Sequence, residues 1–479
     1  MGRRWWVLAV VLAGAVMDLL DSTVMSVAGP SVRSGLGGTQ ATLQWLTAGY
    51  TLPFGVFLVI GGRLGDRWGR RRLFLIGAAG FTLASVACAA AGSPEMLVAG
   101  RVAQGGLGAL MIPQGFGVLT AVFAGAQERG RAFSLFGPVN ALAGIGGPIL
   151  AGALIAGDLA GLGWRLIFLI NVPLGAFAIL GALAWMPGDR GDRTVRLDPI
   201  GAVLVAAGSA ALVLPLIQGR EAGWPWWTFA LPAAAVAAFT VLGRRQRTSP
   251  SPILAPALLR RRPFVAGLSV AAVLFAGVGG LMLVLSLFLQ LGLRYSPLHT
   301  GLALAPIAIG IAVSSLLAPV LHTRLGRTLL HIGLGIELLG VLGLGATAAT
   351  GALGTAAATG GLGGVAGIVA FGVAGLVSGF GLGLLFGPLI QSTLGVAAPD
   401  EVGSASGTLN AVQQIATALG VAVLGTVFLA GDSPADALLT GTLIVAASCA
   451  LCAALVRALP ATEREPTTGR KPSTERESA

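Results

Sequence analysis

The stretch Gly61–Arg72 reads GGRLGDRWGRRR, and it joins two apolar segments that are each long enough to cross a bilayer. It holds five arginines, one aspartate and four glycines. A connection this short and basic is retained on the cytoplasmic side when a membrane protein inserts. Its glycines allow two helix ends to approach closely, and Asp66 among the arginines predicts a latch that opens and closes.

The composition predicts an all-α integral membrane protein. Of the 479 residues, 55% are hydrophobic and 10% are charged, against roughly 25% charged in soluble domains. The mean hydropathy of +0.86 and the 74 glycines fit helices that pack through small residues in lipid. The three cysteines lie in apolar runs without disulfide or zinc spacing, so we expect no metal site and no cofactor.

A window of about 20 residues predicts fourteen membrane spans along the chain. The first, near 5–28, is longer than the apolar part of a signal peptide and carries two aspartates, so we expect it to remain uncleaved. The other spans lie near 42–62, 73–92, 96–121, 132–156, 165–186, 198–218, 226–243, 263–291, 298–321, 328–348, 362–390, 405–430 and 437–459.

The placement of positive charge predicts the orientation. With the N-terminus inside, 25 of the 30 Lys and Arg residues fall in cytoplasmic segments. Four lie outside, namely Arg33, Arg165, Arg220 and Arg294, and Arg101 lies within a span. This asymmetry predicts a multi-pass protein of the plasma membrane with both termini in the cytoplasm. It also accounts for the net charge of +11, and basic residues spread over many connections argue against nucleic-acid binding.

The fourteen expected spans fall into a six plus two plus six arrangement. Residues 1–187 form a first six-helix bundle, 188–262 hold basic connections and two extra helices, and 263–459 form a second six-helix bundle. Residues 460–479 are polar and charged, which predicts a disordered cytoplasmic tail. Two such halves around a central site can rock between inward-open and outward-open states. We expect the protein to act as a monomer in the bilayer.

Asp18 and Asp21 stand three residues apart, which places both on one face of the first span. An ionised carboxylate in a membrane is costly unless it is paired or hydrated, so such residues usually face a cavity. Burial favours the neutral form, and a buried carboxyl group can therefore take up and release protons near neutral pH. The alternatives are a hydrogen bond between helices or a water-filled vestibule.

Two further charged residues lie within spans. Arg101 and Asp21 have similar depths below one face of the membrane, at a rise of about 1.5 Å per residue, and could form an ion pair. Such a pair either takes part in proton coupling or is purely structural. Glu337 lies near mid-membrane in the eleventh span. It is a second protonation site, a counter-charge for a cationic cargo, or a neutral acid bonded to a neighbouring helix.

The Gly61–Arg72 stretch resembles the loop between the second and third helices of the major facilitator superfamily of secondary transporters. Other stretches resemble its 14-span drug:proton antiporter family, and they cover nearly the whole chain. They are LLDSTVMSVAGP from Leu19, AGRVAQGGLGALMIP from Ala99, WRLIFLINVPLG from Trp164, LDPIGAVL from Leu197, LQLGLRYSPLHTGLALAP from Leu289 and SASGTLNAVQQIATALGVAVLG from Ser404. The chain departs from the first pattern at Ser26, where asparagine is usual, and at Gly29, where leucine is usual.

The resemblance implies roles for several residues. Proton coupling is assigned to Asp21 and Arg101, to which Asp18 and Glu337 are added because they are acidic within spans. The cytoplasmic gate comprises Gly62, Asp66, Arg67, Gly69, Arg70 and Arg71. The stretch GIGGPILAGAL resembles an exporter signature, with Ala151 where glycine is common, and it predicts a tight antiporter seam at Gly144, Gly147, Pro148 and Gly152.

Polar residues elsewhere in the spans predict a substrate pathway, with hydrogen bonding between helices as the alternative. They are Gln104, Asn140, Gln290, Asn410 and Gln414. No GxxxxGK[ST] loop is present, so ATP is not expected to drive transport, and no enzyme signature is found. The resemblance implies proton-coupled efflux of small hydrophobic, amphipathic or cationic compounds such as antibiotics. The alternatives are export of a lipid or self-made secondary metabolite, uptake by symport, or a sensor that transports nothing.

Overall fold

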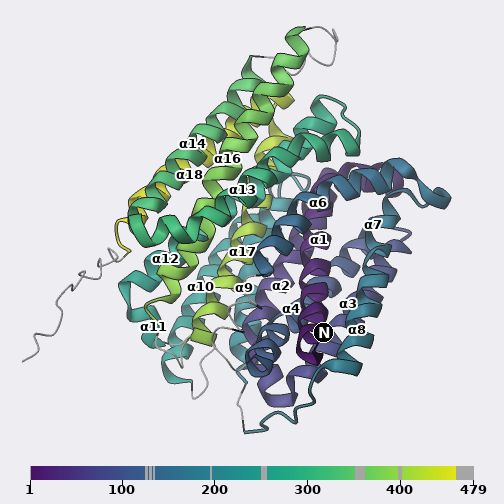
Figure 1. The fold of residues 1–479 in the computed structure, drawn as a ribbon. Coiled ribbons are helices and arrows are strands. Elements are labelled where there is room, and N and C mark those ends of the chain that lie inside the picture. The colour runs from purple at the N-terminus through teal and green to yellow at the C-terminus, as the bar shows by residue number, and fades with distance from the viewer. Residues whose placement is uncertain are drawn as a thin grey trace, which may run out of the picture.

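The long apolar runs form helices, because a backbone in lipid must satisfy its own hydrogen bonds. The computed structural model, drawn in Figure 1, describes residues 2–123, 128, 132, 135–194, 197–249, 256–350, 362–397 and 402–459. The elements found over these residues are all helical. The tail 460–479, expected to be disordered, lies outside the described residues.

The helices follow the expected spans closely. The first half contains α1 (Arg3–Leu36), α2 (Gln40–Trp68), α3 (Arg70–Ala89), α4 (Pro94–Val122), α6 (Phe136–Gly157), α7 (Leu166–Leu169) and α8 (Asn171–Trp185). The middle pair is α9 (Pro199–Gln218) and α10 (Trp227–Thr248). The second half contains α11 (Pro256–Arg260), α12 (Arg262–Leu287), the π-helical turn η3 (Phe288–Gly292), α13 (Pro297–Leu325), α14 (Arg327–Ala349), α16 (Leu362–Leu394), α17 (Val402–Ala430) and α18 (Pro434–Val456).

Local sequence signals determine where several of these helices begin. A serine or aspartate at the N-cap accepts a hydrogen bond from the first turn, and the proline that follows is already restricted to a helical φ. The pairs of this kind are Ser93–Pro94 in α4, Asp198–Pro199 in α9, Ser296–Pro297 in α13 and Ser433–Pro434 in α18.

The number of spans is compatible with the expected fourteen. Within the described residues, twelve helices are long and apolar enough to cross a membrane. The helix α2 adds a thirteenth if its two parts, Gln40–Leu58 and Ile60–Trp68, which meet at 52°, count as one span. The helix α6 qualifies only over the shorter apolar segment Gly146–Gly157. The all-α membrane fold predicted from the sequence is therefore confirmed.

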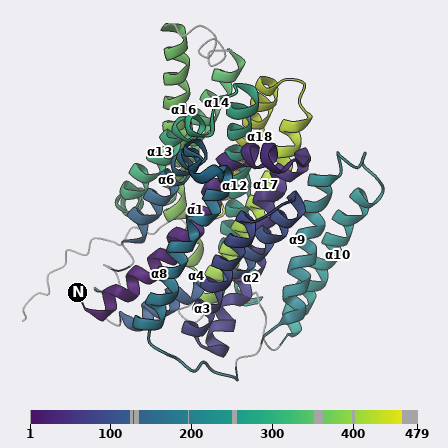
Figure 2. The same cartoon turned by 90° about the vertical axis from the view of Figure 1, so that its right-hand side faces the viewer.

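The two halves meet along two helix pairs. The helix α2 packs against α17, and α6 packs against α13. The middle helices α9 and α10 pack against each other, and α9 also contacts both α2 and α17. Figure 2 shows this pair at the side of the molecule, beside α2 and α17. The extra helices therefore lie on the outside of one seam between the halves.

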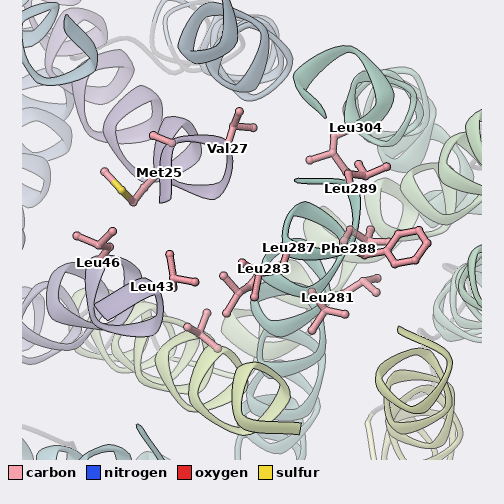
Figure 3. Close-up of a cluster of buried hydrophobic side chains, with 14 of the residues drawn as sticks. Met25, Val27, Leu43, Leu46, Leu281, Leu283, Leu287, Phe288, Leu289 and Leu304 are labelled. Carbon is pink, nitrogen blue, oxygen red and sulfur yellow. The ribbon is translucent and has the colours of Figure 1, made fainter. Parts of the chain in front are cut away.

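The apolar cores differ between the two ends of the bundle. We call the end that carries the Gly61–Arg72 connection the basic end. At the opposite end one cluster joins both halves, and Figure 3 shows Met25 and Leu43 of the first half near Leu283 and Leu287 of the second. Toward the basic end, one large cluster belongs to the first half alone and another to the second half alone. The described halves thus share their main apolar core only at the end opposite the basic connections.

Candidate functional site

The centre of the first half holds a buried ion pair. The Arg101 guanidinium of α4 donates from Nη1 to Oδ2 of Asp21 in α1, and both side chains are at most 1% exposed. Arg101 also donates from Nε to the carbonyl of Leu46 at 2.9 Å. Opposite charges buried together in a membrane offset each other's loss of hydration only when hydrogen bonds are also satisfied. The structure confirms that the two residues, placed at similar depth by sequence, form a pair.

Amide side chains complete the shell around Asp21. Gln104 donates to Asp21 Oδ1 at 3.1 Å, and Asn171, the first residue of α8, donates to the same oxygen at 3.0 Å. Both amides also donate to Ser85 Oγ of α3, at 2.8 and 3.3 Å respectively. The carboxylate therefore receives three side-chain donors from two neighbouring helices, an arrangement that stabilises its ionised form.

Asp18 lies one turn closer to the basic end and has different surroundings. Its carboxylate accepts a hydrogen bond from the hydroxyl of Tyr50 in α2, and it is half-buried. The Tyr50 ring lies under the Arg101 guanidinium, with 4.5 Å between Cζ and the ring centroid. Tyr50 thus connects the two aspartates of α1, because it contacts Asp18 through its hydroxyl and the partner of Asp21 through its ring.

Close approach of α2 and α4 makes this geometry possible. A Cβ atom at Gly105 would overlap the carbonyl oxygen of Tyr50, and a Cβ at Gly108 would lie 3.3 Å from the rings of Phe54 and Phe81. Glycine at these positions lets the two helices touch through their backbones. Arg101, one turn before Gly105, is thereby held against α2.

The basic connection is a tight corner between α2 and α3. Gly69 forms it with φ of +95°, a conformation that favours glycine. Asp66 of α2 and Arg70 of α3 form an ion pair at 2.9 Å across this corner, and Arg70 also donates to the carbonyl of Gly117 at 2.8 Å. Arg71 donates to the carbonyl of Leu183 at 2.6 Å. The expected latch residues are therefore bonded within the first half.

The connection after α8, which contains Asp189 and Asp192, covers this corner. The carboxylate of Asp189 accepts from the backbone N–H groups of Arg70 and Arg71, at 2.7 and 3.2 Å, and so caps the start of α3. The N–H of Asp192 donates to the carbonyl of Asp66 at 2.7 Å. The gate residues Arg67 and Gly62 lie here as well. The carbonyl of Arg67 is so close to Gly191 that a Cβ at Gly191 would overlap it, whereas a Cβ at Gly62 would meet only Pro113, at 4.0 Å.

Hydrogen bonds from Thr194, first through its hydroxyl at 2.7 Å and then through its N–H at 2.9 Å, hold the pKa of the exposed Asp192 below its ordinary value. Asp192 is therefore ionised at neutral pH and adds a negative charge beside the basic corner.

The glycines of α6 point in different directions. A Cβ at Gly147 would overlap the Thr23 hydroxyl of α1, whereas one at Gly152 would overlap the backbone of Leu298 at the start of α13. The carbonyl of Pro148 lies against Gly301 of α13. A Cβ at Gly144 would meet nothing within 4 Å. Close packing of α6 thus involves two partners, one in each half of the molecule.

Glu337 lies in the second half, away from any described cation. Its side chain is 1% exposed and accepts a hydrogen bond from Ser378 Oγ of α16 at 2.9 Å. The glycines Gly381 and Gly340 allow the contact, since a Cβ at either would overlap the facing backbone of α14 or α16. Within the described residues, no salt bridge to Glu337 is found.

The residues expected on a substrate pathway are scattered. Gln104 is fully buried beside Asp21, and Gln290 bridges the halves by donating to the carbonyl of Val27 at 2.9 Å. Gln414 is half-buried and packs against Gly55 of α2, and Asn410 is exposed and donates to the carbonyl of Ser406 at 3.0 Å. The side chain of Asn140 lies outside the described residues. Their roles in transport stay predictions.

The sequence marks Asn171 only as a polar span residue that contacts cargo or bonds to a neighbouring helix, and it gives Asp198 no role. Asp198 is 3% exposed and accepts from Gly201 N at 2.9 Å, Arg245 Nη2 at 3.0 Å and Gln246 Nε2 at 3.2 Å. Burial alone would raise its pKa, but these donors hold the pKa of Asp198 below its ordinary value. Aspartate directly before a proline that opens an apolar run was the available signal.

Within the described residues, no group of three or more His, Cys, Asp and Glu side chains could hold a metal ion. The expectation that no cofactor takes part stays a prediction.

Comparison with known proteins identifies the family of this chain. The sequence profile of the Major Facilitator Superfamily matches residues 10–421. The chain belongs to this superfamily. This superfamily member is 45% identical over 431 residues to the probable actinorhodin transporter of Streptomyces coelicolor, which covers 89% of this chain and 72% of that protein. It is 35% identical over 431 residues to the puromycin resistance protein pur8 of Streptomyces alboniger, covering 89% and 82%.

The solved structures agree on the fold. The crystal structure of a D-xylose-proton symporter matches with a TM-score of 0.65 at 18% identity, covering 97% of this chain and all of that one. The major facilitator fold and the multi-pass membrane character predicted from the sequence are therefore confirmed. The family is one of transporters, and the two relatives are named for transport of one compound and resistance to another.

Proposed function

We propose that this chain exports small hydrophobic, amphipathic or cationic antibiotic-like compounds from the cytoplasm in exchange for protons. The observation that carries the proposal is the buried Asp21–Arg101 pair at the centre of a transporter fold. Burying a charge in a membrane is costly, and apolar side chains could fill the same space at lower cost. A buried charged residue in a membrane protein therefore indicates a functional role. The relatives named for transport and resistance supply the class of cargo.

The orientation follows from the distribution of charge. The basic end faces the cytoplasm, which places both termini inside and the opposite end outside a plasma membrane. The apolar core shared by the halves at the outer end then supports an inward-open state, in which cargo enters from the cytoplasm or inner leaflet. The chain works as a monomer, with its own two halves as the moving parts.

Proton uptake changes the balance at the ion pair. When Asp21 becomes protonated, Arg101 loses the counter-charge that its burial needs, and this cost favours movement of the helices that carry the two residues. Protonation of Asp18 leaves that pair intact and acts instead on the hydrogen bond from Tyr50. Protonation from outside would favour return to the inward-open state after cargo is released. A potential of about 100 mV supplies about 2.3 kcal/mol for each charge that crosses.

The test uses everted membrane vesicles, whose cytoplasmic face is accessible. Vesicles with the protein should accumulate ethidium and puromycin when a proton gradient is imposed, and should lose the accumulation when a protonophore collapses it. Vesicles that lack the protein are the control. Accumulation that persists without the gradient would contradict proton coupling, and no accumulation of either compound would contradict the cargo class.

A second candidate is export of a metabolite that the cell itself makes. It is favoured by the 45% identity to a protein named as a probable actinorhodin transporter. The same vesicles decide between the two, because a narrow exporter would move one compound of an extract from the producing cell and leave ethidium behind. Export of a lipid would instead appear as a changed lipid profile in a deletion strain.

The latch at the basic corner is part of the proposed cycle. Asp66 is bonded to Arg70 in this state, so removing its charge should alter the switching between states rather than the choice of cargo. We expect Asp66→Asn to lower the turnover of every compound by a similar factor, measured as initial rates in the vesicles. A changed order of preference among compounds, at normal turnover, would count against a gating role.

A further inference from the structure

One atom of the buried network has no partner. Asn171 is fully buried, and its Nδ2 group donates to Asp21 Oδ1 at 3.0 Å and to Ser85 Oγ at 3.3 Å, yet its Oδ1 atom accepts no hydrogen bond. Buried polar atoms in proteins are nearly always paired, so each exception calls for an explanation. Among the unpartnered buried atoms of the described residues, the one on Asn171 lies directly beside a buried charge.

Gln104 contacts the same oxygen but is fixed in one orientation. Its Nε2 group donates to Asp21 at 3.1 Å, and its Oε1 atom accepts from Arg101 Nη1 at 3.0 Å and from Cys88 Sγ at 3.3 Å. Turning this amide over would set its NH₂ group against the guanidinium. A turn of Asn171 would break its weak bond to Ser85 Oγ at 3.3 Å, but it would break no bond to Arg101, because nothing is bonded to the carbonyl oxygen of Asn171.

The two protonation states of Asp21 need opposite partners. The ionised carboxylate only accepts hydrogen bonds, whereas the protonated acid must also donate one. Oδ2 already faces Arg101, so a proton added at Oδ1 has Gln104 and Asn171 as its neighbours. Of these two amides, Asn171 alone can exchange its donor for an acceptor without breaking a bond to Arg101.

We propose that Asn171 is a positioning residue that follows the protonation of Asp21, donating to the carboxylate and, after its amide turns over, accepting from the acid. The proton comes from water and forms one O–H bond at Oδ1, so the site gains one positive charge while Arg101 stays charged. The inference rests on the proposed proton coupling and names the residue of α8 that carries the change to another helix. Because α7 and α8 form one continuous segment with the turn at Arg165, the outer end of the first half is directly connected to the switch.

The ionisable groups that surround Asn171 and its partners come from four helices. They are Asp21 and Asp18 of α1, Tyr50 of α2, Cys88 of α3 and Arg101 of α4. Arg165 points elsewhere, since it donates to the carbonyl of Ala91 at 3.2 Å. Among them Asp21 is the group within hydrogen-bond distance of Asn171.

Infrared difference spectroscopy on the purified full chain in liposomes tests this without requiring transport. As the pH is lowered, a carboxylic-acid band that is missing in Asp21→Asn should appear together with a change in an amide carbonyl band. The amide change should vanish in Asn171→Leu, while the midpoint of the Asp21 titration stays where it is, since both protonation states lose one hydrogen bond. If Asn171→Leu does not fold, Asn171→Ser replaces it, because the serine hydroxyl both donates and accepts. This variant should fold, lose the amide change and keep the midpoint of the Asp21 band.

Each other outcome overturns the proposal. A midpoint that moves to higher pH in Asn171→Leu would show that Asn171 serves only as a donor to the ionised form. An amide change that persists in that variant would arise from another residue, and no Asp21 band at any pH would mean that Asp21 does not titrate. Ser209→Ala, which removes another unpartnered buried atom far from Asp21, is the control and should leave both bands unchanged. If the export assay fails while both bands behave as predicted, the proposed function is contradicted and the role of Asn171 is not.

Discussion

Asp21 and Glu337 are both about 1% exposed, yet their surroundings have little in common. Asp21 faces a guanidinium and two amides from neighbouring helices, whereas Glu337 faces one hydroxyl in a glycine-lined contact between α14 and α16. A counter-charge with several donors suits a carboxyl group that is ionised for part of a cycle. A single hydroxyl suits a neutral acid that joins two helices. The partners of a buried carboxyl group, more than its depth, therefore indicate whether it can exchange a proton usefully.

The largest effect is expected from Asp21→Asn. The substitution leaves Arg101 buried without a counter-charge, at a cost of about 3–5 kcal/mol, and removes the proposed proton site. Gradient-driven efflux in everted vesicles should fall to the level of vesicles without the protein. Asp432→Asn, the same change at an exposed acid, is the matched control and should transport normally. Suppose instead that Asp21→Asn, with equal protein in the membrane, exports near the wild-type rate. Asp21 would then be no more a proton-exchanging group than Glu337.

Arg101→Lys should have the next largest effect. Lysine keeps the charge but loses the fork that holds Asp21, Gln104 and the Leu46 carbonyl together. Losing hydrogen bonds to a charged group costs about 1.5–3 kcal/mol, which corresponds to roughly a 10- to 100-fold slower efflux if the cost falls on the rate-limiting step. Initial rates compared with Arg33→Lys, a control outside the network, check this. A rate equal to wild type would show that charge alone is sufficient.

Asp198→Asn separates a structural ion pair from a coupling site. Asp198 also has an arginine partner, Arg245, but it lies at the end of α9, where we expect a loss of thermal stability equivalent to about 1–2 kcal/mol and normal proton dependence. Its pKa is lowered in the folded protein, so its stabilisation is complete above the ordinary value of about 3.9 and is lost as the pH falls through the lower folded value.

Melting temperatures of wild type and Asp198→Asn should therefore differ by a constant amount from pH 8 to 5 and converge only below about pH 4. A difference that already disappears near pH 6 would contradict this assignment. Loss of proton-driven efflux in a folded Asp198→Asn protein would show that an arginine partner is enough to make a coupling site.

The smallest effect is expected from Glu337→Gln. Glutamine can still accept the hydrogen bond from Ser378, so the change in stability should be below about 1 kcal/mol and efflux of neutral compounds should be unchanged. Efflux of ethidium is measured beside it, since a counter-charge role would slow the cation selectively. A loss of all gradient-driven efflux would instead make Glu337 a second protonation site.

Much of the fold could be predicted because its signals are local. Long apolar runs set the helices, and capping residues followed by proline, such as Ser296–Pro297, set where they begin. The similar depth of Asp21 and Arg101 could also be predicted, since depth in a membrane follows from residue count at a fixed rise, whereas their contact came from the structure. These predictions needed no knowledge of how the helices are arranged around each other.

What could not be predicted depends on tertiary packing. The sequence left Gln104 open between a substrate pathway and a bond between helices, and its position next to Asp21 depends on how the face of α4 that carries Arg101 turns toward α1 and α3. The helical period directs Gly147 toward α1 and Gly152 toward α13, although the sequence groups them in one stretch. The cap that Asp189 places on α3 joins segments more than a hundred residues apart, and nothing local to either signals it.

The most direct test of the account is to let cargo drive protons. Purified protein is placed in liposomes that contain a pH-sensitive dye, an outward ethidium gradient is imposed in the absence of any proton gradient, and the internal pH is followed. We predict that ethidium leaving through the wild-type protein brings protons in, with no pH change in Asp21→Asn. Ethidium movement through the wild-type protein without a pH change, or an equal pH change in Asp21→Asn, would contradict proton exchange at Asp21.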